Sequence, residues 1–267
     1  MLFSVLIPTH SRPAQLRQCV EKLIADNQGI FDFEIIISYD DELNDAYTAL
    51  AAHYNCVQLV KSKGPGPATS RNTAADFASG EWLVFLDDDS TPGSFLLQAY
   101  SKQITHHPEC KVFEGAILAE TQRQRFDEEA PLNWEGGHLW SCNFCMQKEY
   151  FFSIGGFDQT FILPLLEDVD LRIRIQKNQQ PICFTPEAVV IHPWRIYQPY
   201  RNIRRRLKKH RYFFRKHHRT GIAHRIERSI FFIKEFVKLT GHLFKYSCKG
   251  FHAYVDKNLV NFLLIFY

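Results

Sequence analysis

The sequence predicts an α/β domain over residues 1–195, in which helices flank a mainly parallel sheet, and a basic helical extension over residues 196–267. Short apolar runs alternate with helical patterns in residues 1–100, which indicates βαβ units. The charge changes sign along the chain, because residues 1–195 hold 15 lysines and arginines against 26 acidic residues, whereas residues 196–267 hold 17 against three. With 267 residues, 45% of them hydrophobic, the chain can bury a large core, so a disordered protein is excluded.

Residues 1–110 are expected to form the first half of the sheet. Ser11 is expected to cap a helix that starts at Pro13, because apolar residues recur after it at helical spacing. A second helix is expected from Thr69 to Ala78 and is expected to end at Gly80. Apolar runs predict four strands, at Leu2–Ile7, Glu34–Ser38, Val57–Lys61 and Trp82–Leu86.

Residues 111–195 are expected to form the second half. The predicted elements are a strand at Val112–Ala119, a polar loop at 120–137, an extended segment at His138–Met146 and a turn at Gly155–Asp158. Glu167–Lys177 fits two structures, because its apolar residues alternate as in a strand while its acids precede its bases as in a helix. We expect the helix, since Asp168–Arg172 and Asp170–Arg174 are also spaced as i,i+4 ion pairs.

The seven cysteines are odd in number and lie mostly in apolar runs, as in a reduced cytosolic protein. Cys142 and Cys145 form a CxxC motif, but no second pair of cysteines or histidines lies at zinc-site spacing. The N-terminus has no signal-peptide pattern, and no run reaches the ~20 apolar residues needed to span a bilayer. We therefore expect a cytoplasmic protein that lies peripherally on the inner face of a membrane.

Three aspartates, Asp87, Asp88 and Asp89, follow the fourth predicted strand directly. Ligands bind beyond the carboxyl ends of parallel strands, and Pro8, Thr9 and Asp40 also follow strands at that edge. Adjacent carboxylates repel one another unless a cation lies among them, and a divalent metal with oxygen ligands meets that need. An acidic turn without a metal is the alternative.

A second group of candidate residues lies farther along the chain. Arg71 follows a glycine-proline loop at a helix start, where backbone N–H groups and a guanidinium can bind phosphate. Glu167 and Asp168 begin a predicted helix, whose N-terminus would keep Asp168 ionised as a general base requires. His192 ends an apolar run and becomes a metal-ligand candidate only if Asp89 lies nearby.

The order and spacing of six motifs closely resemble those of the family 2 glycosyltransferases, over residues 2–195. The motifs are Pro8-Thr9, Asp40, Gly66 to Asn72, Gly80 to Asp89, Gly155 to Asp158 with Glu167 to Leu171, and Val189 to His192. The resemblance implies a GT-A fold, a Rossmann-like architecture in which residues 1–110 bind a nucleotide-diphosphate sugar and residues 111–195 bind the acceptor. It also implies inversion at the anomeric carbon and a divalent metal, Mn²⁺ or Mg²⁺.

The resemblance implies a role for each matching residue. Pro8, Thr9, Arg12, Asp40, Arg71, Asp87 and Asp88 would bind the donor, and Asp89, with His192, would bind the metal. Asp168 would be the catalytic base in a hexosyltransferase-like reaction. The usual family pattern has a polar-aromatic residue and then Asn after Pro-Thr, whereas this chain has His10 and Ser11, which is a departure in this loop.

Residues 196–267 lie outside the resemblance. Residues 201–228 alone hold 12 lysines and arginines against the single acid Glu227. A helical apolar face follows, formed by Phe232, Ile233, Phe236, Val237, Leu243 and Phe244, with Lys234, Lys238 and Lys245 elsewhere. We expect this extension to bind an anionic membrane, which suits a saccharide or lipid-linked acceptor in surface-glycan assembly. The alternatives are that it packs on the catalytic body or on a second subunit, or that it binds nucleic acid, for which no recognition motif is present.

Two other functions stay open on the sequence alone. Asp87 to Thr91 fits the DxDxT motif of haloacid-dehalogenase-like phosphatases, although in those enzymes the motif follows the first strand. The chain could also be a scaffold that keeps the fold without turnover and uses its basic tail to hold a membrane or a partner. Intact Asp89 and Asp168 favour the enzyme.

Overall fold

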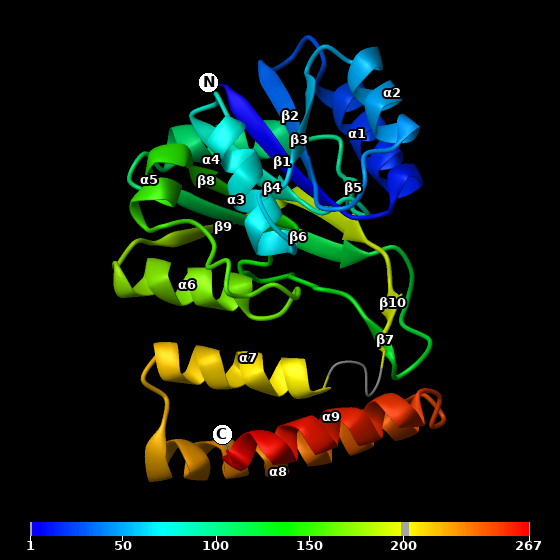
Figure 1. Cartoon of the computed structure of the whole chain (residues 1–267), viewed down its shortest axis with the longest axis vertical. Helices are drawn as coiled ribbons and strands as arrows, with labels where there is room; N and C mark the ends of the chain where they lie inside the picture. Colours follow the sequence, from blue (N-terminus) through cyan, green and yellow to red (C-terminus); the bar gives the residue numbers. More distant parts are fainter. Residues whose placement is uncertain (1, 199–202, 267) are drawn as a thin grey trace. The chain divides into compact units, whose positions relative to one another are not determined.

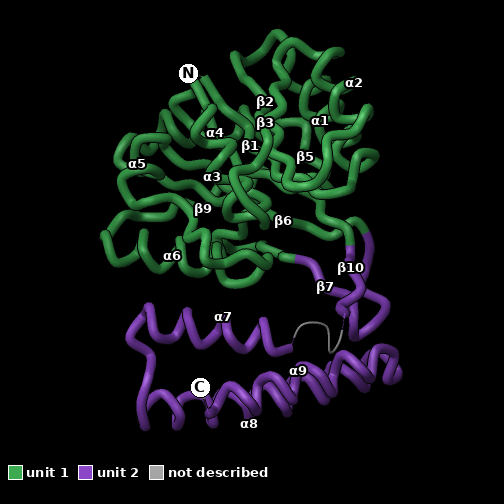
Figure 2. The backbone as a smooth tube through the Cα atoms, in the orientation of Figure 1, with its two compact units in different colours: residues 1–120, 131–193 green, residues 121–130, 194–267 purple. Residues whose placement is uncertain are grey.

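The computed structural model describes residues 2–198 and 203–266. The chain forms two compact units: Met1–Glu120 with Pro131–Pro193, and Thr121–Ala130 with Trp194–Tyr267 (Figure 2). The first unit contains the sheet and all the candidate site residues. The second unit contains three long helices.

The sheet of the first unit has eight strands and is mixed but mainly parallel (Figure 1). Their order is β3-β2-β1-β4-β8-β6-β9-β5, in which β8 and β5 are antiparallel to their neighbours. This architecture confirms the predicted α/β class. The strands are β1 (Phe3–Thr9), β2 (Phe33–Tyr39), β3 (Val57–Lys61), β4 (Trp82–Leu86), β5 (Thr91–Pro92), β6 (Val112–Ala119), β8 (Asn143–Gln147) and β9 (Ile182–His192).

Helices cover both faces of this sheet, because alternate side chains of its buried strands point to opposite sides. Val5 and Ile7 of β1 face a core shared with α1 (Pro13–Asn27), α2 (Asp45–His53) and α4 (Leu96–His106). Leu6, between them, faces a core shared with α3 (Pro67–Phe77), α5 (Lys148–Ser153) and α6 (Glu167–Lys177).

Two predicted helix caps are wrong. Ser11 has a positive φ of 55° and its N–H donates to Asp41, so Arg12 occupies the N-cap position of α1. Gly80 does not cap α3, which ends at Phe77 with Ala78 as its C-cap. A Cβ at Gly80 would lie 2.6 Å from Ser4 Oγ, so glycine is needed there for close approach of two backbone segments.

The helix predicted at Glu167–Lys177 is confirmed as α6. Of its two expected ion pairs, Asp170 and Arg174 form one, with Arg174 Nε 2.9 Å from Asp170 Oδ2. Arg172 instead donates to the carbonyl of Gly137. Asp168 is therefore not tied to the outer face of its own helix by Arg172.

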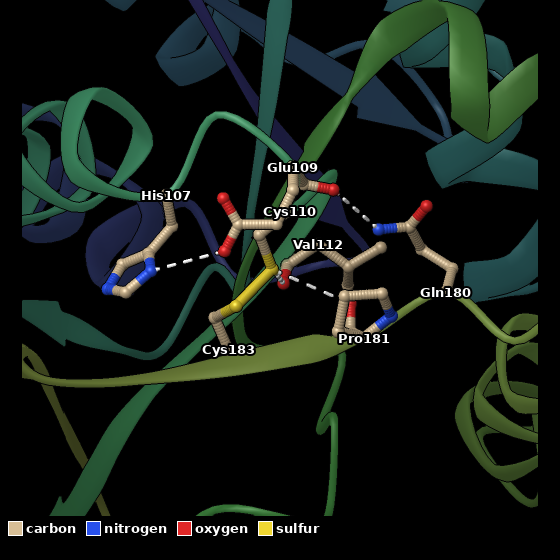
Figure 3. The surroundings of a disulfide bond; sticks show 7 residues. All are labelled: His107, Glu109, Cys110, Val112, Gln180, Pro181 and Cys183. Atoms are coloured by element: carbon tan, nitrogen blue, oxygen red, sulfur yellow. Dashed lines mark hydrogen bonds and ion pairs between the residues drawn. A yellow bond between two sulfur atoms is a disulfide. The ribbon is translucent and has the colours of Figure 1, made fainter.

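The structure corrects the expectation that all cysteines are reduced, because Cys110 and Cys183 form a disulfide (Figure 3). The two residues are 73 positions apart. Cys183 lies on β9, and Cys110 lies two residues before β6. The parallel pairing of β6 with β9, in which Phe113 is opposite Cys183, brings these two segments side by side. That pairing is a long-range contact that cysteine spacing does not reveal. The other five cysteines are free, including both members of the CxxC motif.

The second unit consists of a short two-stranded antiparallel sheet and a helical bundle. Its elements are β7 (Glu128–Glu129) and β10 (Arg195–Ile196), which pair, followed by α7 (Ile203–Lys216), α8 (Gly221–Lys245), α9 (Phe251–Leu263) and a final 3₁₀ turn at Leu264–Phe266. Its core includes Phe126, Leu243 and Ala253. Within residues 2–198 and 203–266, no helix has the length and apolarity to cross a bilayer.

A buried carboxylate joins the helices of this second unit to its N-terminal segment. Asp256 of α9 is fully buried and accepts hydrogen bonds from Tyr197 and from Arg206 of α7, whose Nη1 lies 2.8 Å away. Residues 121–130, predicted as a polar loop, belong to this unit, and Phe126 packs on Tyr254 of α9.

Candidate active site

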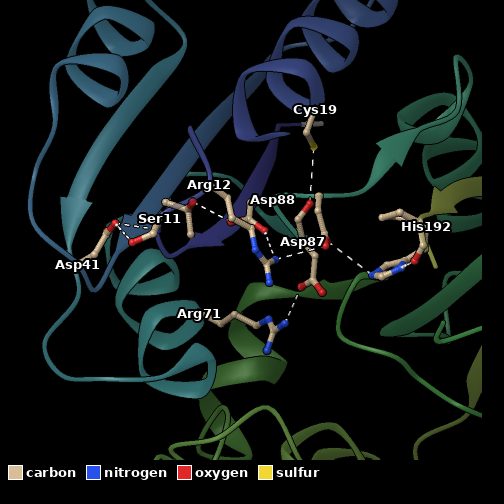
Figure 4. A network of polar contacts seen from close by, with 11 residues as sticks. Ser11, Arg12, Cys19, Asp41, Arg71, Asp87, Asp88 and His192 are labelled. Carbon is tan, nitrogen blue, oxygen red and sulfur yellow. Dashed lines mark hydrogen bonds and ion pairs between the residues drawn. The ribbon is translucent and has the colours of Figure 1, made fainter. Parts of the chain in front are cut away.

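The segment Asp87–Asp89 crosses from the end of β4 to the start of β5. All five residues of β4 are buried, and β5 pairs with β9 so that Thr91 lies opposite Ile191. This register brings Asp89, two residues before Thr91, to His192, one residue after Ile191. The ring of His192, labelled in Figure 4, has its Nε2 3.6 Å from Asp89 Oδ1. The condition set for His192 as a metal-ligand candidate is therefore met.

The hydrogen bonding of His192 places Nε2 on the side of Asp89. The imidazole is fully buried, and its Nδ1 lies 2.8 Å from the carbonyl oxygen of Pro193. A carbonyl only accepts, so Nδ1 carries a proton, and Nε2 is the nitrogen that a neutral ring would offer to a metal. This is the orientation of histidine ligands in metalloproteins, which donate from their second nitrogen. Ligand atoms of Asp87, Asp89 and His192 lie within 4.8 Å of one another, a spacing that fits one divalent cation.

Asp88 faces the opposite side, toward the loop after β1. Its carboxylate accepts from Thr9 Oγ1 at 2.8 Å and from Arg12 Nη1 at 2.9 Å. Arg12 Nη1 also lies 3.3 Å from Asp89 Oδ2. Burial raises the pKa of Asp88 above its ordinary value, although Arg12 and Thr9 act to lower it. Thr9, Arg12 and Asp88 thus form one polar cluster at the edge of the sheet.

Arg71 joins the two groups of acids. Its guanidinium, only 3% exposed, contacts Asp87 Oδ1 through Nη2 at 2.7 Å and Glu167 Oε1 through Nη1 at 3.4 Å. Burial acts to lower the pKa of Arg71, but the charges of Asp87 and Glu167 prevail and raise it. Both of these contacts are to carboxylates, so in this structure Arg71 neutralises acids at the position where we expected a phosphate ligand.

Two side chains for which the sequence predicted no role in the site, Asn72 and Arg174, hold α6 against α3. Asn72 of α3 accepts from the N–H of Phe157 at 2.9 Å and donates to the carbonyl of the same residue at 2.8 Å. Arg174 of α6 donates to the carbonyls of Ile154 and Gly156, each at 2.6 Å. The turn between these partners therefore fixes the N-terminus of α6, and with it Glu167 and Asp168, beside Arg71.

The two acids at the start of α6 are both buried. Glu167 is 3% exposed, and burial, with the neighbouring charge of Asp168, raises its pKa to about 7. Burial also raises the pKa of Asp168, and this effect outweighs the lowering by the N–H of Val169, 2.7 Å from Asp168 Oδ1. The direction expected from the helix end alone is therefore reversed. A carboxylate with a raised pKa is the stronger base.

Asp40 lies at the end of β2 and ties three segments together. Its Oδ1 lies 2.6 Å from His10 Nδ1, and its Oδ2 accepts from the N–H of Gly66 at 2.7 Å. Gly66 has a φ of 92°, and a Cβ there would lie 2.0 Å from the carbonyl oxygen of Ile162. Only glycine fits this point of the loop. Pro8 of β1 lies opposite Ser38 of β2, so the residues that follow the two strands, His10 and Asp40, lie close together.

The arrangement offers three chemical capacities in one unit of the chain. Asp87, Asp89 and His192 could hold a divalent cation, Thr9, Arg12, Asp40 and Asp88 present polar groups at the carboxyl ends of the strands, and Asp168 could accept a proton. His10, Asp40 and Asp41 are a second group whose ligand atoms lie within 4.8 Å of one another, but His10 is largely exposed.

Comparisons with known proteins agree with this geometry. Residues 4–111 match the sequence profile described as "Glycosyl transferase family 2". An uncharacterized glycosyltransferase of Haemophilus influenzae is 27% identical over 202 residues, which are 70% of this chain and 65% of that protein. The GalNAc(5)-diNAcBac-PP-undecaprenol beta-1,3-glucosyltransferase of Campylobacter jejuni is 26% identical over 74% of this chain and 65% of its own. The chain thus spans just under two thirds of the length of these two relatives.

Solved structures show the same fold. The S. aureus TarS fragment 1–349 in complex with UDP-GlcNAc superposes with a TM-score of 0.58 at 18% identity, over 74% of this chain and 60% of that one. GalNAc-T7 with UDP, GalNAc and Mn²⁺ superposes with a TM-score of 0.62 at 15% identity, over 74% and 45%. Residues 4–111 thus match glycosyltransferase family 2, and the mixed, mainly parallel sheet together with these solved structures confirms the GT-A fold.

Proposed function

We propose that this protein transfers a sugar from a nucleotide-diphosphate donor to an acceptor hydroxyl, with inversion at the anomeric carbon. The observation that carries the proposal is the Arg71 bridge, because one buried guanidinium contacts both Asp87, beside the candidate cation site, and Glu167, beside the candidate base. In an inverting transfer the base and the leaving diphosphate lie on opposite sides of one sugar. The bridge supports this arrangement, because a single side chain reaches from the candidate cation site to the residue beside the candidate base.

The donor would lie over the carboxyl ends of β1, β2 and β4. Thr9, Arg12, Asp40 and Asp88 would bind the nucleoside and ribose, since Thr9, Arg12 and Asp88 already form one hydrogen-bonded cluster there and Asp40 follows the neighbouring strand β2. Asp87, Asp89 and His192 would hold Mn²⁺ or Mg²⁺, and the cation, when bound, supplies positive charge that stabilises the departing diphosphate. The Mn²⁺ in the GalNAc-T7 structure supports this assignment by analogy of fold.

Asp168 would act as the catalytic base. Its carboxylate takes the proton of the acceptor hydroxyl while that oxygen forms a bond to C1 of the sugar. The bond from C1 to the diphosphate oxygen breaks on the opposite face, and its electron pair leaves with the diphosphate. Glu167 and Arg71 would position this base, because they contact each other and are buried beside it.

The acceptor would be a saccharide or a lipid-linked saccharide in surface-glycan assembly. The Campylobacter jejuni relative is named for an undecaprenol-linked acceptor, and another, from Bacillus spizizenii, is named a poly(ribitol-phosphate) beta-glucosyltransferase. The basic second unit would attach the enzyme to an anionic membrane, where such acceptors are held.

Calorimetry tests the donor and the metal together. UDP, GDP and dTDP are titrated into the full chain, each with and without Mn²⁺. We expect one nucleotide to bind, more tightly with Mn²⁺ than without. Absence of binding to all three with the metal present would favour a scaffold without turnover.

A single substitution tests the base. Asp168→Asn is expected to abolish transfer while nucleotide binding is kept, because the amide cannot accept the acceptor proton. Asp45→Asn, which changes an exposed acid in the first turn of α2, is the matched control and is expected to change neither. If the folded Asp168→Asn variant loses binding and transfer equally, Asp168 is not the base.

A further inference from the structure

The most unusual surface of the described residues lies on α8. Eight large apolar side chains of this helix are solvent-exposed, and six of them are more than half exposed: Ile222 (78%), Ile226 (56%), Ile230 (51%), Ile233 (62%), Val237 (67%) and Phe244 (69%). These six recur at spacings of three, four and seven residues, so they lie along one side of the helix, and we name them the α8 stripe. At 1.5 Å per residue the stripe is about 33 Å long.

The α8 stripe is separate from the face by which α8 packs inside the second unit. Leu243 is 4% exposed in the core of that unit, and the ring of Phe232 lies 5.8 Å from that of Phe262. The sequence predicted a single apolar face on this helix, which included both Leu243 and Ile233. The structure divides them, because Leu243 and Phe232 pack inward while Ile233, Val237 and Phe244 face solvent.

Cations lie beside the α8 stripe. Lys234, Lys238 and Lys245 are exposed, and at 100° per residue they project from one flank of the stripe, whereas Arg225 projects from the other. Lysine and arginine can lay their aliphatic stems along an apolar surface while the charged end reaches water or a phosphate. Glu227 shares the lysine flank, and Glu235 pairs with Lys238 at 3.2 Å, so the surface combines an apolar centre with a border that is cationic on balance.

The positive charge of this surface distinguishes among the partners that could cover it. Residues 196–267 hold 17 cationic residues against three acids, so a second copy of the same face would bring like charges together. A nucleic acid would pair with the cations but would leave the apolar stripe in water. The interface of an anionic bilayer satisfies both parts, since acyl chains accept the stripe and anionic headgroups accept the border.

We propose that α8 lies in the plane of an anionic bilayer, with the α8 stripe inserted among the acyl chains and Arg225, Lys234, Lys238 and Lys245 at the level of the lipid phosphates. This inference deepens the proposed function, on which its biological meaning rests, because it identifies the residues that hold the transferase where lipid-linked acceptors are found. Insertion of one side of a helix is distinct from spanning, for which no described helix qualifies.

Co-sedimentation of the full chain with vesicles tests the proposal. The vesicles contain phosphatidylcholine alone or phosphatidylcholine with phosphatidylglycerol. We expect binding to the anionic vesicles only, and the variant Ile226→Ser/Ile233→Ser is expected to bind them at least about tenfold more weakly, because two inserted side chains lose their apolar surface. Isoleucine and serine have similar helix propensities, so α8 is expected to stay helical.

Two further variants make the result specific. Ile30→Ser/Leu43→Ser removes two exposed apolar side chains from the first unit, and it is expected to bind vesicles as the unchanged protein does. Lys234→Gln/Lys238→Gln leaves the stripe intact and is expected to weaken binding to anionic vesicles, with a smaller effect at high salt.

The outcomes separate this inference from the proposed function. Vesicle binding that is unchanged in Ile226→Ser/Ile233→Ser, or equal on both kinds of vesicle, would overturn the inference. So would a change from dimer to monomer in sedimentation without lipid, which would show that a second copy covers the stripe. Calorimetry with UDP and Mn²⁺ on the same variants reports the proposed function alone, and binding there is expected to be unchanged.

Discussion

Replacing Glu167 by glutamine is expected to stabilise the protein at alkaline pH. Glu167 is buried, and its pKa is about 7 in the folded chain against an ordinary value of 4.5. A raised pKa means that folding favours the protonated form. The contribution of Glu167 to the free energy of unfolding is therefore highest below pH 4.5, falls as the pH rises to 7, and stays low above it. Glutamine has no charge to bury and escapes this loss.

The size of the effect follows from the same values. Each pKa unit corresponds to about 1.4 kcal/mol, so the cost of the ionised Glu167 above pH 7 is at most about 3 kcal/mol. Glu167→Gln is expected to unfold at a higher urea concentration than the unchanged protein at pH 8 and at nearly the same concentration at pH 4.5. Glu149→Gln, at an exposed glutamate in the first turn of α5, is the control and is expected to change little at either pH. Lower stability of Glu167→Gln at pH 8 would show that the ion pair with Arg71 outweighs the cost of burial.

Three other substitutions test separate parts of the structure. Arg71→Met leaves buried carboxylates without their cation, and urea denaturation at pH 7 is expected to show a loss of about 3–5 kcal/mol, whereas equal stability would contradict the bridge. Gly66→Ala is expected to cost more than Gly29→Ala, because both glycines have a positive φ but only Gly66 has a backbone oxygen at the position of the new Cβ, and equal costs would refute the close packing. Replacing Cys110 and Cys183 by alanine is expected to lower the free energy of unfolding by about 2–5 kcal/mol, and peptide mass spectrometry without reductant should recover the linked pair from the unchanged protein.

Much of the fold could be predicted because it depends on local patterns. The strands at Val57–Lys61, Trp82–Leu86 and Val112–Ala119 have the bounds expected from their apolar runs. The order of charges gave the helix at Glu167–Lys177, where alternation of apolar residues pointed to a strand. The helix Asp45–His53 was not predicted, although Asn44 accepts from two N–H groups at its start and is a typical N-cap.

The errors concern contacts between distant segments. The disulfide depends on the pairing of β6 with β9, and the role of Gly80 depends on the approach of Ser4. Neither contact can be predicted from the residues next to it in the sequence. The reversed pKa direction of Asp168 has the same origin, because its burial is set by packing and not by the end of its helix.

The sequence predicted which residues belong to the candidate site but not which of them contact one another. The meeting of Asp89 with His192 follows from the register of β5 against β9, which only the structure gives. We expected a phosphate beside Arg71, and nothing in the sequence indicated that Arg71 would pair with Glu167. A buried arginine with two acids is hard to foresee when 96 residues separate the partners.

The location of a bound Mn²⁺ relative to Asp168 tests the central claim most directly. Crystals grown with UDP and MnCl₂ would give the position of the metal from its anomalous scattering. We predict one Mn²⁺ bound by Asp89 and His192, with the Asp168 carboxylate facing the same cavity across a gap that one sugar ring can fill. A metal bound away from these two residues, or an Asp168 carboxylate that faces another side of the domain, would contradict the account.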